Sequence, residues 1–251
     1  MTSRPEPTLR PPSPQDQMNG PDLVVVAIDG PSGSGKSTVS RLAAQRLGYG
    51  YLDTGAMYRA ATWWCLREGL PLGDQERVAE AVLAMPLAMG TDPASPTVEV
   101  AGEDIGIPIR ATEISTQVSQ VATNLAVRAE LRRRQREIIG LVGRDLGGIV
   151  AEGRDITTVV APDADVRILL VASEEARLRR RSTELHGTAS AEAVAATRDQ
   201  VVRRDRDDST VSTFLTAAPG VTTIDTSDLT LAGSVEAVLD EIAAAMGRIR
   251  D

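Results

Sequence analysis

Residues 30–37 read GPSGSGKS, which satisfies the spacing GxxxxGK(S/T) in full. In such a loop the glycines allow backbone N–H groups to point at phosphate oxygens, and the following helix adds its positive end. The lysine neutralises the β- and γ-phosphates, and the next hydroxyl binds magnesium. The pattern therefore predicts a nucleoside-triphosphate site. Its expected contacts are Gly30, Pro31, Ser32, Gly33, Ser34, Gly35, Lys36, Ser37 and Thr38, with Ser37 as a magnesium ligand.

Lys36 is the only lysine in a chain whose lysines and arginines total 27. A compact ammonium on a flexible stem and a planar guanidinium are not interchangeable, so the position that keeps lysine indicates a need for the ammonium. As a residue of an exposed loop, Lys36 is expected to matter for catalysis and little for folding. The alternative, a glycine-rich turn without a nucleotide, is disfavoured because an apolar run precedes the loop and helical spacing follows it.

A phosphate-binding loop does not by itself separate a kinase from a GTPase or a motor ATPase. The stretch YLDTGAMYR at residues 51–59 is the first candidate for a second-substrate site. Asp53 or Thr54 could simply cap a helix that begins near Gly55. Arg59 falls on the next turn, where it could reach an anion held at the helix start. Alone, the stretch leaves both interpretations open.

A second candidate is IVAEGRD at residues 149–155. An apolar strand ends in Glu152, and a glycine turn then presents Arg154 and Asp155. Sites in open α/β sheets lie at the carboxyl ends of strands, where these groups fall. We expect Glu152 to hold magnesium or a metal-bound water, as acids do on the strand beside a phosphate-binding loop. The alternative is a surface turn with a local Arg–Asp pair.

The pattern of apolar residues indicates an α/β fold that positions these motifs. Strands are expected at 23–28, 149–151, 166–171 and 221–224, and helices at 37–47, 56–68, 113–123, 127–141, 174–185, 191–206 and 231–249. Strands that alternate with helices predict a parallel sheet covered on both faces. Residues 71–110 are rich in proline and glycine and alternate at 98–100 and 105–109, which predicts a small hairpin-bearing insert.

Composition narrows the class of protein. The 251 residues are 42% hydrophobic, enough for a core, whereas a formal charge of −8 and 2% aromatic residues disfavour nucleic-acid binding. One cysteine and one histidine, Cys65 and His186, cannot supply the usual zinc ligands or an internal disulfide, which favours the cytoplasm. No apolar run approaches the roughly 20 residues of a membrane helix. Residues 1–21 read as a flexible extension.

The motifs GPSGSGKS, LDTGAMYR, SQVA…VR, AEGRDI and RRDRDDS, in this order and spacing, resemble the bacterial cytidylate kinase family from about Leu23 onward. The resemblance implies phosphoryl transfer from ATP to CMP or dCMP with Mg²⁺ in a cytoplasmic protein, which we expect to be a monomer. It implies a P-loop kinase with three α/β/α layers and a parallel five-stranded sheet in a domain of residues 22–251. A monophosphate-binding insert would occupy about 71–130, and a short lid about 174–190.

The resemblance also implies roles for individual residues. Thr54, Arg59 and Arg154 would hold the acceptor phosphate. Residues that read cytosine or surround the sugar and base would be Ser119, Arg128, Asp155, Arg204 and Asp208. The lid arginines would be Arg177, Arg180 and Arg181. Residues expected to act in catalysis are Lys36, Arg154, Asp155, Arg177 and Arg181.

The sequence departs from the family at one place. An arginine usually follows the RDxxDS stretch, whereas here RRDRDDS is followed by TVSTFLTAAPG. Unless Arg203 or Arg206 compensates, we expect weaker CMP binding or looser discrimination between bases. A kinase of UMP or of a phosphorylated metabolite, and a nucleotide-gated regulatory protein that hydrolyses ATP slowly, are the competing hypotheses. The arginines of LRRRQR at 131–136 read as a solvated helix face, His186 as a solvated lid residue, and Trp63, Trp64 and Cys65 as packing residues.

Overall fold

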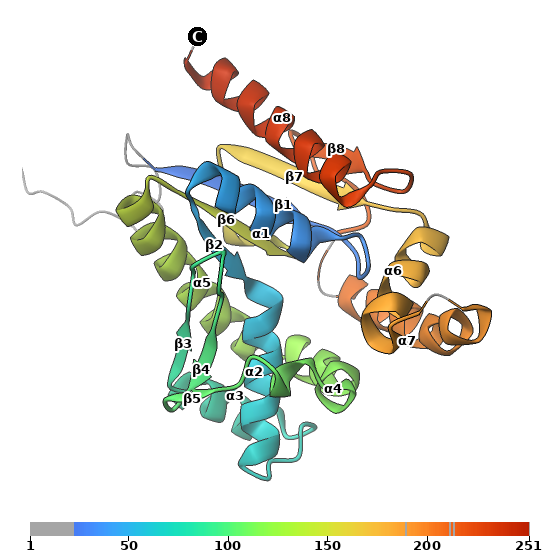
Figure 1. The fold of residues 1–251 in the computed structure, drawn as a ribbon. Coiled ribbons are helices and arrows are strands. Elements are labelled where there is room, and N and C mark those ends of the chain that lie inside the picture. The colour runs from blue at the N-terminus through green and yellow to red at the C-terminus, as the bar shows by residue number, and fades with distance from the viewer. Residues whose placement is uncertain (1–22, 189, 211, 213, 251) are drawn as a thin grey trace, which may run out of the picture.

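The computed structural model describes residues 23–188, 190–210, 212 and 214–250, and its ribbon is drawn in Figure 1. Within this part of the chain, one sheet has five strands, all paired in parallel, in the order β2-β6-β1-β7-β8. The strands are β1 (Val24–Asp29), β2 (Gly50–Asp53), β6 (Gly148–Gly153), β7 (Val166–Val171) and β8 (Thr222–Asp225). The predicted parallel five-stranded sheet is confirmed.

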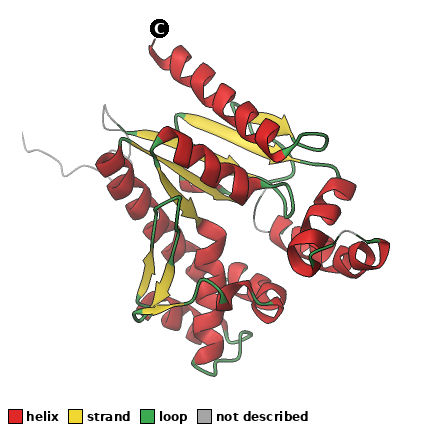
Figure 2. Ribbon diagram, in the orientation of Figure 1, coloured by secondary structure: helices red, strands yellow, loops and turns green. Residues whose placement is uncertain are grey.

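Helices cover both faces of this sheet, which gives three layers (Figure 2). Alternate residues of β1 serve opposite faces: Val26 and Ile28 pack with α1 (Lys36–Leu47) and α8 (Leu231–Arg250). Val25 and Ala27 belong to the core that α2 (Thr54–Arg67) and α5 (Leu125–Leu146) complete. The strand is therefore buried on both sides, which explains why its sequence is a continuous apolar run. No helix among the described residues is long and apolar enough to cross a membrane.

The region after α2 contains α3 (Gln75–Ala84), a three-stranded antiparallel sheet and α4 (Thr112–Ala122). The strands are β3 (Leu87–Met89), β4 (Val98–Val100) and β5 (Glu103–Asp104). The expected hairpin is present, because β4 and β5 pair antiparallel, but the ten-residue helix α3, which Asp74 caps between two prolines, was not predicted. The expected strand at 105–109 is wrong. Pro108 begins a 3₁₀ turn that leaves Ile107 87% exposed.

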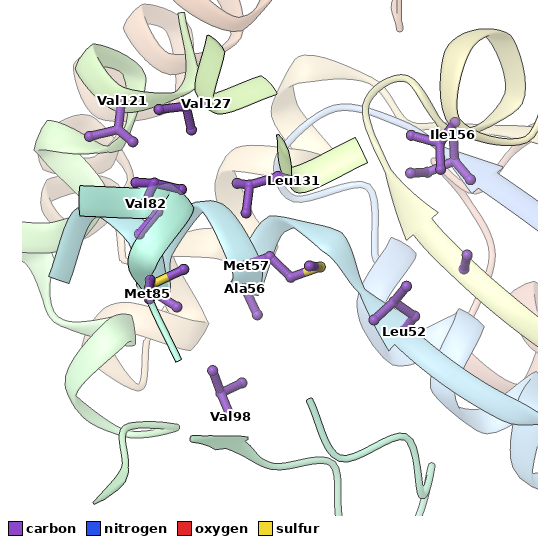
Figure 3. Packing of buried hydrophobic residues seen from close by; sticks show 14 of the residues in the cluster. Leu52, Ala56, Met57, Val82, Met85, Val98, Val121, Val127, Leu131 and Ile156 are labelled. Carbon is purple, nitrogen blue, oxygen red and sulfur yellow. The ribbon is translucent and has the colours of Figure 1, made fainter. Parts of the chain in front are cut away.

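One apolar cluster joins the large sheet to this region. Leu52, Met57, Val82, Val98 and Leu131 belong to it, and Figure 3 shows them converging around α2. Residues from β2, α2, α3, β4 and α5 thus share one core. Truncating a buried side chain such as Met57 to alanine is expected to cost about 2–5 kcal/mol of folding free energy. This shared packing fixes the start of α2 relative to the sheet.

The remaining helices lie at the carboxyl end of the sheet, where α2 also begins. After β6 comes a short π-helix, η2 (Ile156–Val160). After β7, α6 (Glu174–His186) and α7 (Ala191–Ser209) form an adjacent pair, at the right of Figure 1. Both helices were expected from the sequence, with α7 ending three residues later than predicted. They bring the arginine-rich segments to the loop that follows β1.

Candidate active site

The glycine-rich loop joins β1 to α1 at the carboxyl end of the sheet. Gly33 and Gly35 have φ angles of +77° and +87°, which favour glycine. A Cβ at Gly33 would lie 2.6 Å from the backbone oxygen of Arg177, so helix α6 approaches this loop closely. Gly35 immediately precedes α1, whose N-terminal end therefore points at the loop. The local geometry matches an anion-binding loop.

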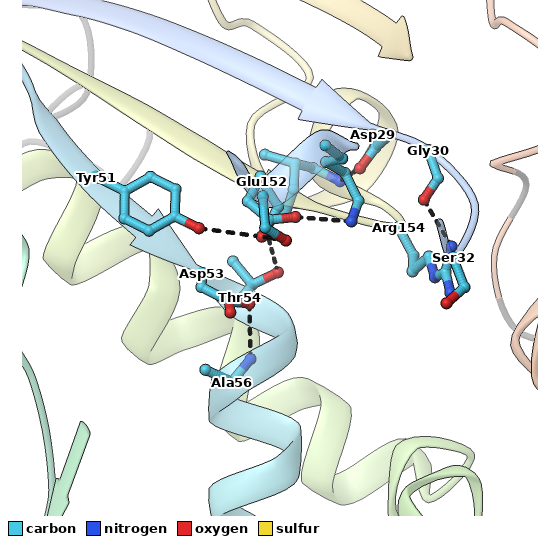
Figure 4. Close-up of polar contacts among 12 residues, drawn as sticks. Asp29, Gly30, Ser32, Tyr51, Asp53, Thr54, Ala56, Glu152 and Arg154 are labelled. Carbon is cyan, nitrogen blue, oxygen red and sulfur yellow. Dashed lines mark hydrogen bonds and ion pairs between the residues drawn. The ribbon is translucent and has the colours of Figure 1, made fainter. Parts of the chain in front are cut away.

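Glu152, at the end of β6, is the centre of the site. It is 1% exposed, and its Oε2 lies 2.8 Å from the Lys36 ammonium. The Ser37 hydroxyl donates to its Oε1 at 2.6 Å, and the Tyr51 hydroxyl donates to the same oxygen at 3.2 Å (Figure 4). Burial, and then the charge of Glu152, raise the pKa of Tyr51 well above its usual value. Tyr51 therefore stays protonated and can act as a donor.

The start of α2 shows which of Asp53 and Thr54 caps the helix. The Asp53 carboxylate accepts the Ala56 N–H at 2.8 Å and pairs with Arg59 at 2.8 Å, so Asp53 is the helix cap. Thr54 instead donates its hydroxyl to the Glu152 carbonyl at 2.8 Å. Burial is the largest influence on the pKa of Asp53 and raises it, but Arg59, the Ala56 N–H and Lys36 outweigh burial and the pKa is lowered.

The strand register places these groups together. Asp53 of β2 pairs with Glu152 of β6, and Asp29 of β1 pairs with Gly153. The glycine-rich loop, the start of α2 and the AEGRD turn therefore meet at one edge of the sheet. At Gly153 a Cβ would lie 2.4 Å from the Thr54 hydroxyl oxygen, so glycine is needed for this close approach.

Asp155 faces the helix α5. Arg128 Nη2 lies 2.6 Å and Arg132 Nη2 lies 3.0 Å from Asp155 Oδ2. Asp155 and Arg128 are buried, at 4% and 5% exposed. Arg154 contacts the Gly30 carbonyl and Asp205, and Asp155 is buried. The alternative of a local Arg154–Asp155 pair at the surface is therefore wrong.

Arg132 is one of the site's charged groups that sequence reasoning missed. The expected solvated face at 131–136 is wrong for three of its four arginines. Arg132 contacts Asp155, Arg134 donates to carbonyls at the end of α3, and Arg136 donates to carbonyls of η2. Arg132 lies four residues after Arg128 on one helix, hence on the same face. That spacing was the available signal.

Arg154 and Arg177 reach the glycine-rich loop from different elements. Arg154 donates to the Gly30 carbonyl at 2.6 Å, and its guanidinium lies 4.4 Å from the centre of the Phe214 ring. Arg177 donates to the Ser32 carbonyl at 3.1 Å. Both arginines pair with Asp205 of α7, which the sequence analysis also missed. The turn after β6 and the helices α6 and α7 are thus tied to the loop.

Arg180 has a different place from Arg177. It donates to the Ser34 carbonyl at 3.3 Å and to the hydroxyl and carbonyl of Thr226 at 3.0 and 2.5 Å. Thr226 follows β8 and donates its own hydroxyl to Ser34 at 3.1 Å. Arg180 therefore links the glycine-rich loop to the end of the sheet. Arg181 lies half-buried on the same helix.

Some predicted residues lie apart from these contacts or outside the described side chains. Ser119 is half-buried in α4, where its carbonyl accepts the Thr123 hydroxyl at 2.9 Å. Arg204 and Asp208 belong to α7, but their side chains are outside the described part of the structure, as are those of Arg203 and His186. The packing role expected for Cys65 is confirmed, because its side chain is buried in the hydrophobic core.

Asp29 supports the turn that carries Arg154 and Asp155. It is 1% exposed and accepts N–H bonds from Ile156 and Thr157 at 2.9 and 2.8 Å, and the Thr157 hydroxyl at 2.6 Å. Burial raises its pKa despite these bonds. No role was predicted for Asp29. The available signal was its position, because it is an acid at the end of a strand and directly before the glycine-rich loop.

Comparison with known proteins identifies a family. The model of the family described as cytidylate kinase matches residues 26–244. A cytidylate kinase of Streptomyces griseus is 46% identical over 86% of this chain and 91% of its own length. A cytidylate kinase of Nocardia farcinica is 45% identical over 88% of this chain and 92% of its own length. A solved gluconokinase of Sinorhizobium meliloti is more distant, with 16% identity and a TM-score of 0.42 over 90% of this chain.

Proposed function

The chain belongs to the cytidylate kinase family, and we propose that it transfers the γ-phosphoryl group of ATP to CMP or dCMP. The observation that carries this proposal is the meeting of three motifs at one sheet edge. Glu152 belongs to the AEGRD segment. It pairs with Lys36 of the glycine-rich loop, its carbonyl accepts the Thr54 hydroxyl at the start of α2, and it lies beside Asp53 in the sheet. A donor phosphate in the loop and an acceptor phosphate beside Arg59 and Arg154 would then face each other.

The chemistry of the acceptor explains the residues present. A monophosphate is already an anion, so transfer needs no strong general base and depends on positioning and on charge neutralisation. Lys36 is assigned to the donor phosphates, Arg59 and Arg154 to the acceptor phosphate, and Arg177 to the phosphoryl group in transit. Each of these cations already contacts a carboxylate or a loop carbonyl at the same sheet edge. Lys36 and Arg59 would exchange their carboxylate partners for phosphate oxygens and so stay paired with an anion, whereas Arg154 would keep its bond to the Gly30 carbonyl.

The acceptor base is assigned to residues of α4 and α5 and to Asp155. Cytosine presents a carbonyl and a ring nitrogen as acceptors and an amino group as donor. Arg128 supplies donors and Asp155 supplies acceptors, and the two are held together at 2.6 Å. Ser119 is assigned to the same edge, and Arg204 and Asp208 to the sugar and base. Uracil lacks the amino group and would leave an acceptor unpaired.

The donor set fits magnesium. Mg²⁺ prefers oxygen ligands and uses one or two carboxylates besides phosphates and water. The Glu152 carboxylate and the Ser37 hydroxyl lie within 2.6 Å of each other and provide such oxygens. When bound, the metal neutralises charge on the phosphates during transfer. We therefore propose that Ser37 and Glu152 hold it, directly or through water.

We also propose how the chain is organised and where it works. Residues 71–130 act as the monophosphate-binding insert and residues 174–190 as the lid, within a domain of residues 22–251. The protein acts in the cytoplasm as a monomer on small molecules alone. The molar mass of the purified protein, measured by light scattering, tests whether it is a monomer.

Amide hydrogen exchange tests the assignment of the insert and the lid. CMP should slow exchange in α4 and α5, and an ATP analogue should slow exchange in α6.

A substrate panel tests the function. Initial rates are measured in a coupled assay with MgATP and, in turn, CMP, dCMP, UMP, AMP and GMP. The proposal predicts turnover with CMP and dCMP well above the others. Equal or higher turnover with AMP or GMP would assign the enzyme to another acceptor. ATP loss that does not depend on any acceptor would instead support a nucleotide-gated regulatory protein.

A further inference from the structure

Asp205, on α7, lies against the glycine-rich loop from the side of the lid. Asp205 is 7% exposed. Its Oδ1 accepts the backbone N–H of Ser32 at 3.2 Å and lies 3.4 Å from Arg154 Nη2, and its Oδ2 pairs with Arg177 Nη1. Three positive or donating groups from the loop, from the turn after β6 and from α6 therefore converge on one carboxylate.

These three partners have a property in common. A backbone N–H of a glycine-rich loop and two arginines are the donors that recognise a phosphate group. A carboxylate offers the same kind of negatively charged oxygen acceptors as a phosphate. We propose that Asp205 is a positioning residue whose carboxylate takes the place of a substrate phosphate. Before nucleotides bind, it keeps the loop, Arg154 and Arg177 close to one another. When a phosphate binds, the phosphate replaces the carboxylate as the acceptor for these donors.

The exchange follows from charge. A phosphate that bound the Ser32 N–H, Arg154 and Arg177 would meet the Asp205 carboxylate at the same donors, and two anions repel each other at that distance. Asp205 must therefore withdraw. Because Arg177 belongs to α6 and Asp205 to α7, the withdrawal would couple phosphate binding to a rearrangement of the helix pair.

Arg154 would keep its orientation during this exchange. Its guanidinium lies over the Phe214 ring at 4.4 Å, and it donates to the Gly30 carbonyl at 2.6 Å. Neither contact involves Asp205. Arg154 thus keeps its contacts with Phe214 and Gly30. Only its contact with the Asp205 carboxylate is replaced by a contact with the substrate phosphate.

The test measures binding without turnover. Isothermal titration with MgATP alone, and with pyrophosphate as the smallest probe, gives dissociation constants for the wild-type chain and for Asp205→Asn. Removing the internal anion removes a competitor, so both constants should fall by about three- to tenfold. Asp205→Ser, a second variant without the charge, should behave likewise. Asp205→Glu, which keeps the charge, should stay near the wild-type value.

A matched control separates this effect from a general change in charge. Glu174 pairs with Arg198 between the same two helices, at 47% exposed, and touches neither the loop nor Asp205 in the described contacts. Glu174→Gln should leave both dissociation constants unchanged. A fall of the same size in Glu174→Gln would overturn the proposal, because any lost acid would then suffice.

Other outcomes are equally decisive. If charge-free variants bind MgATP more weakly and also lose kcat, Asp205 is a structural support and the proposal is wrong. Unchanged constants, or failure of both charge-free variants to fold, would also refute it. The inference rests on the proposed function only through the phosphate site. If the wild-type chain bound neither MgATP nor pyrophosphate, the proposed function would fail first; if it bound both and Asp205→Asn changed nothing, the inference alone would fail.

Discussion

The Lys36 ammonium lies 2.8 Å from the Glu152 carboxylate, and this pair joins the phosphate-binding loop to the end of β6. The side chains of both residues are largely buried, at 14% and 2% exposed. The expectation that Lys36 is exposed is therefore wrong, and its small effect on folding becomes a question for experiment. The same pair that would balance the phosphates also contributes to the fold, because it neutralises a carboxylate inside the protein.

Lys36→Ala should consequently lose stability as well as activity. Breaking a buried ion pair by removing one partner costs about 3–5 kcal/mol, and the bonds from Ser37 and Tyr51 to Glu152 will reduce that cost. Urea unfolding measures the change. Arg46→Ala, which removes one member of an exposed pair with Glu236, is the matched control and should be nearly neutral. Equal stabilities for Lys36→Ala and wild type would contradict this role.

Glu152→Gln should weaken magnesium binding, and it also removes the ion pair with Lys36. The amide keeps the shape of the side chain but loses the charge that Lys36 and a metal ion require. We expect kcat to fall by about 10²- to 10³-fold and the magnesium concentration for half-maximal rate to rise. Titration of activity with MgCl₂ at saturating nucleotides measures both effects. An unchanged magnesium requirement would remove Glu152 from the metal site.

The pH dependence of stability should report the Asp53–Arg59 pair. The folded-state pKa of Asp53 lies below the ordinary value of 3.8, so its ionised form stabilises the fold above that pH. This contribution is lost as pH falls from 3.8 through the folded-state pKa. In Asp53→Asn, the free energy of unfolding should be lower at neutral pH and decline less in that acidic range. Parallel wild-type and variant profiles would refute the assignment.

Arg132→Gln tests a residue that only the structure revealed. Loss of its contact with Asp155 leaves Arg128 as the remaining partner on that carboxylate, and the KM for CMP should rise about fivefold to twentyfold. The KM for ATP should change little, because Arg132 contacts no residue of the glycine-rich loop in the described part of the chain. Arg133→Gln, on the exposed side of the same helix, is the control and should leave both values unchanged.

Base discrimination should be loose for a cytidylate kinase because no arginine follows the RDRDDS stretch. Arg206 is exposed on α7, and the side chain of Arg203 is not described. We predict a measurable rate with UMP and a raised KM for CMP. The ratio of kcat/KM for CMP to that for UMP is the quantity to measure. Ordinary CMP affinity together with strong rejection of UMP would show that another group has replaced the missing arginine.

The sequence predicted most of what lies at strand ends and little of what joins distant segments. Local spacing identified the glycine-rich loop, and the apolar run before Glu152 placed that acid at a strand end. The cap at Asp53 stayed ambiguous because a cap and a substrate site use the same residue types, and the bond from the Ala56 N–H identifies Asp53 as the cap. Asp205 was missed because its partners are far from it in the chain.

The missed elements have physical reasons as well. Helix α3 is short and lies between prolines, so its apolar spacing spans too few turns to stand out. Strand β2 has only four residues and ends in the helix-capping acid, which hides its alternation. The alternation at 105–109 suggested a strand, yet Ile105 and Ile109 are buried across a turn that Pro108 begins.

Direct identification of the product tests the central claim. The protein is incubated with ATP labelled on the γ-phosphate, magnesium and CMP, and the products are separated by chromatography. Label should move into CDP, one for each ATP consumed, and dCMP should accept it in the same way. Label found only as inorganic phosphate, or ATP consumed equally with and without CMP, would contradict it.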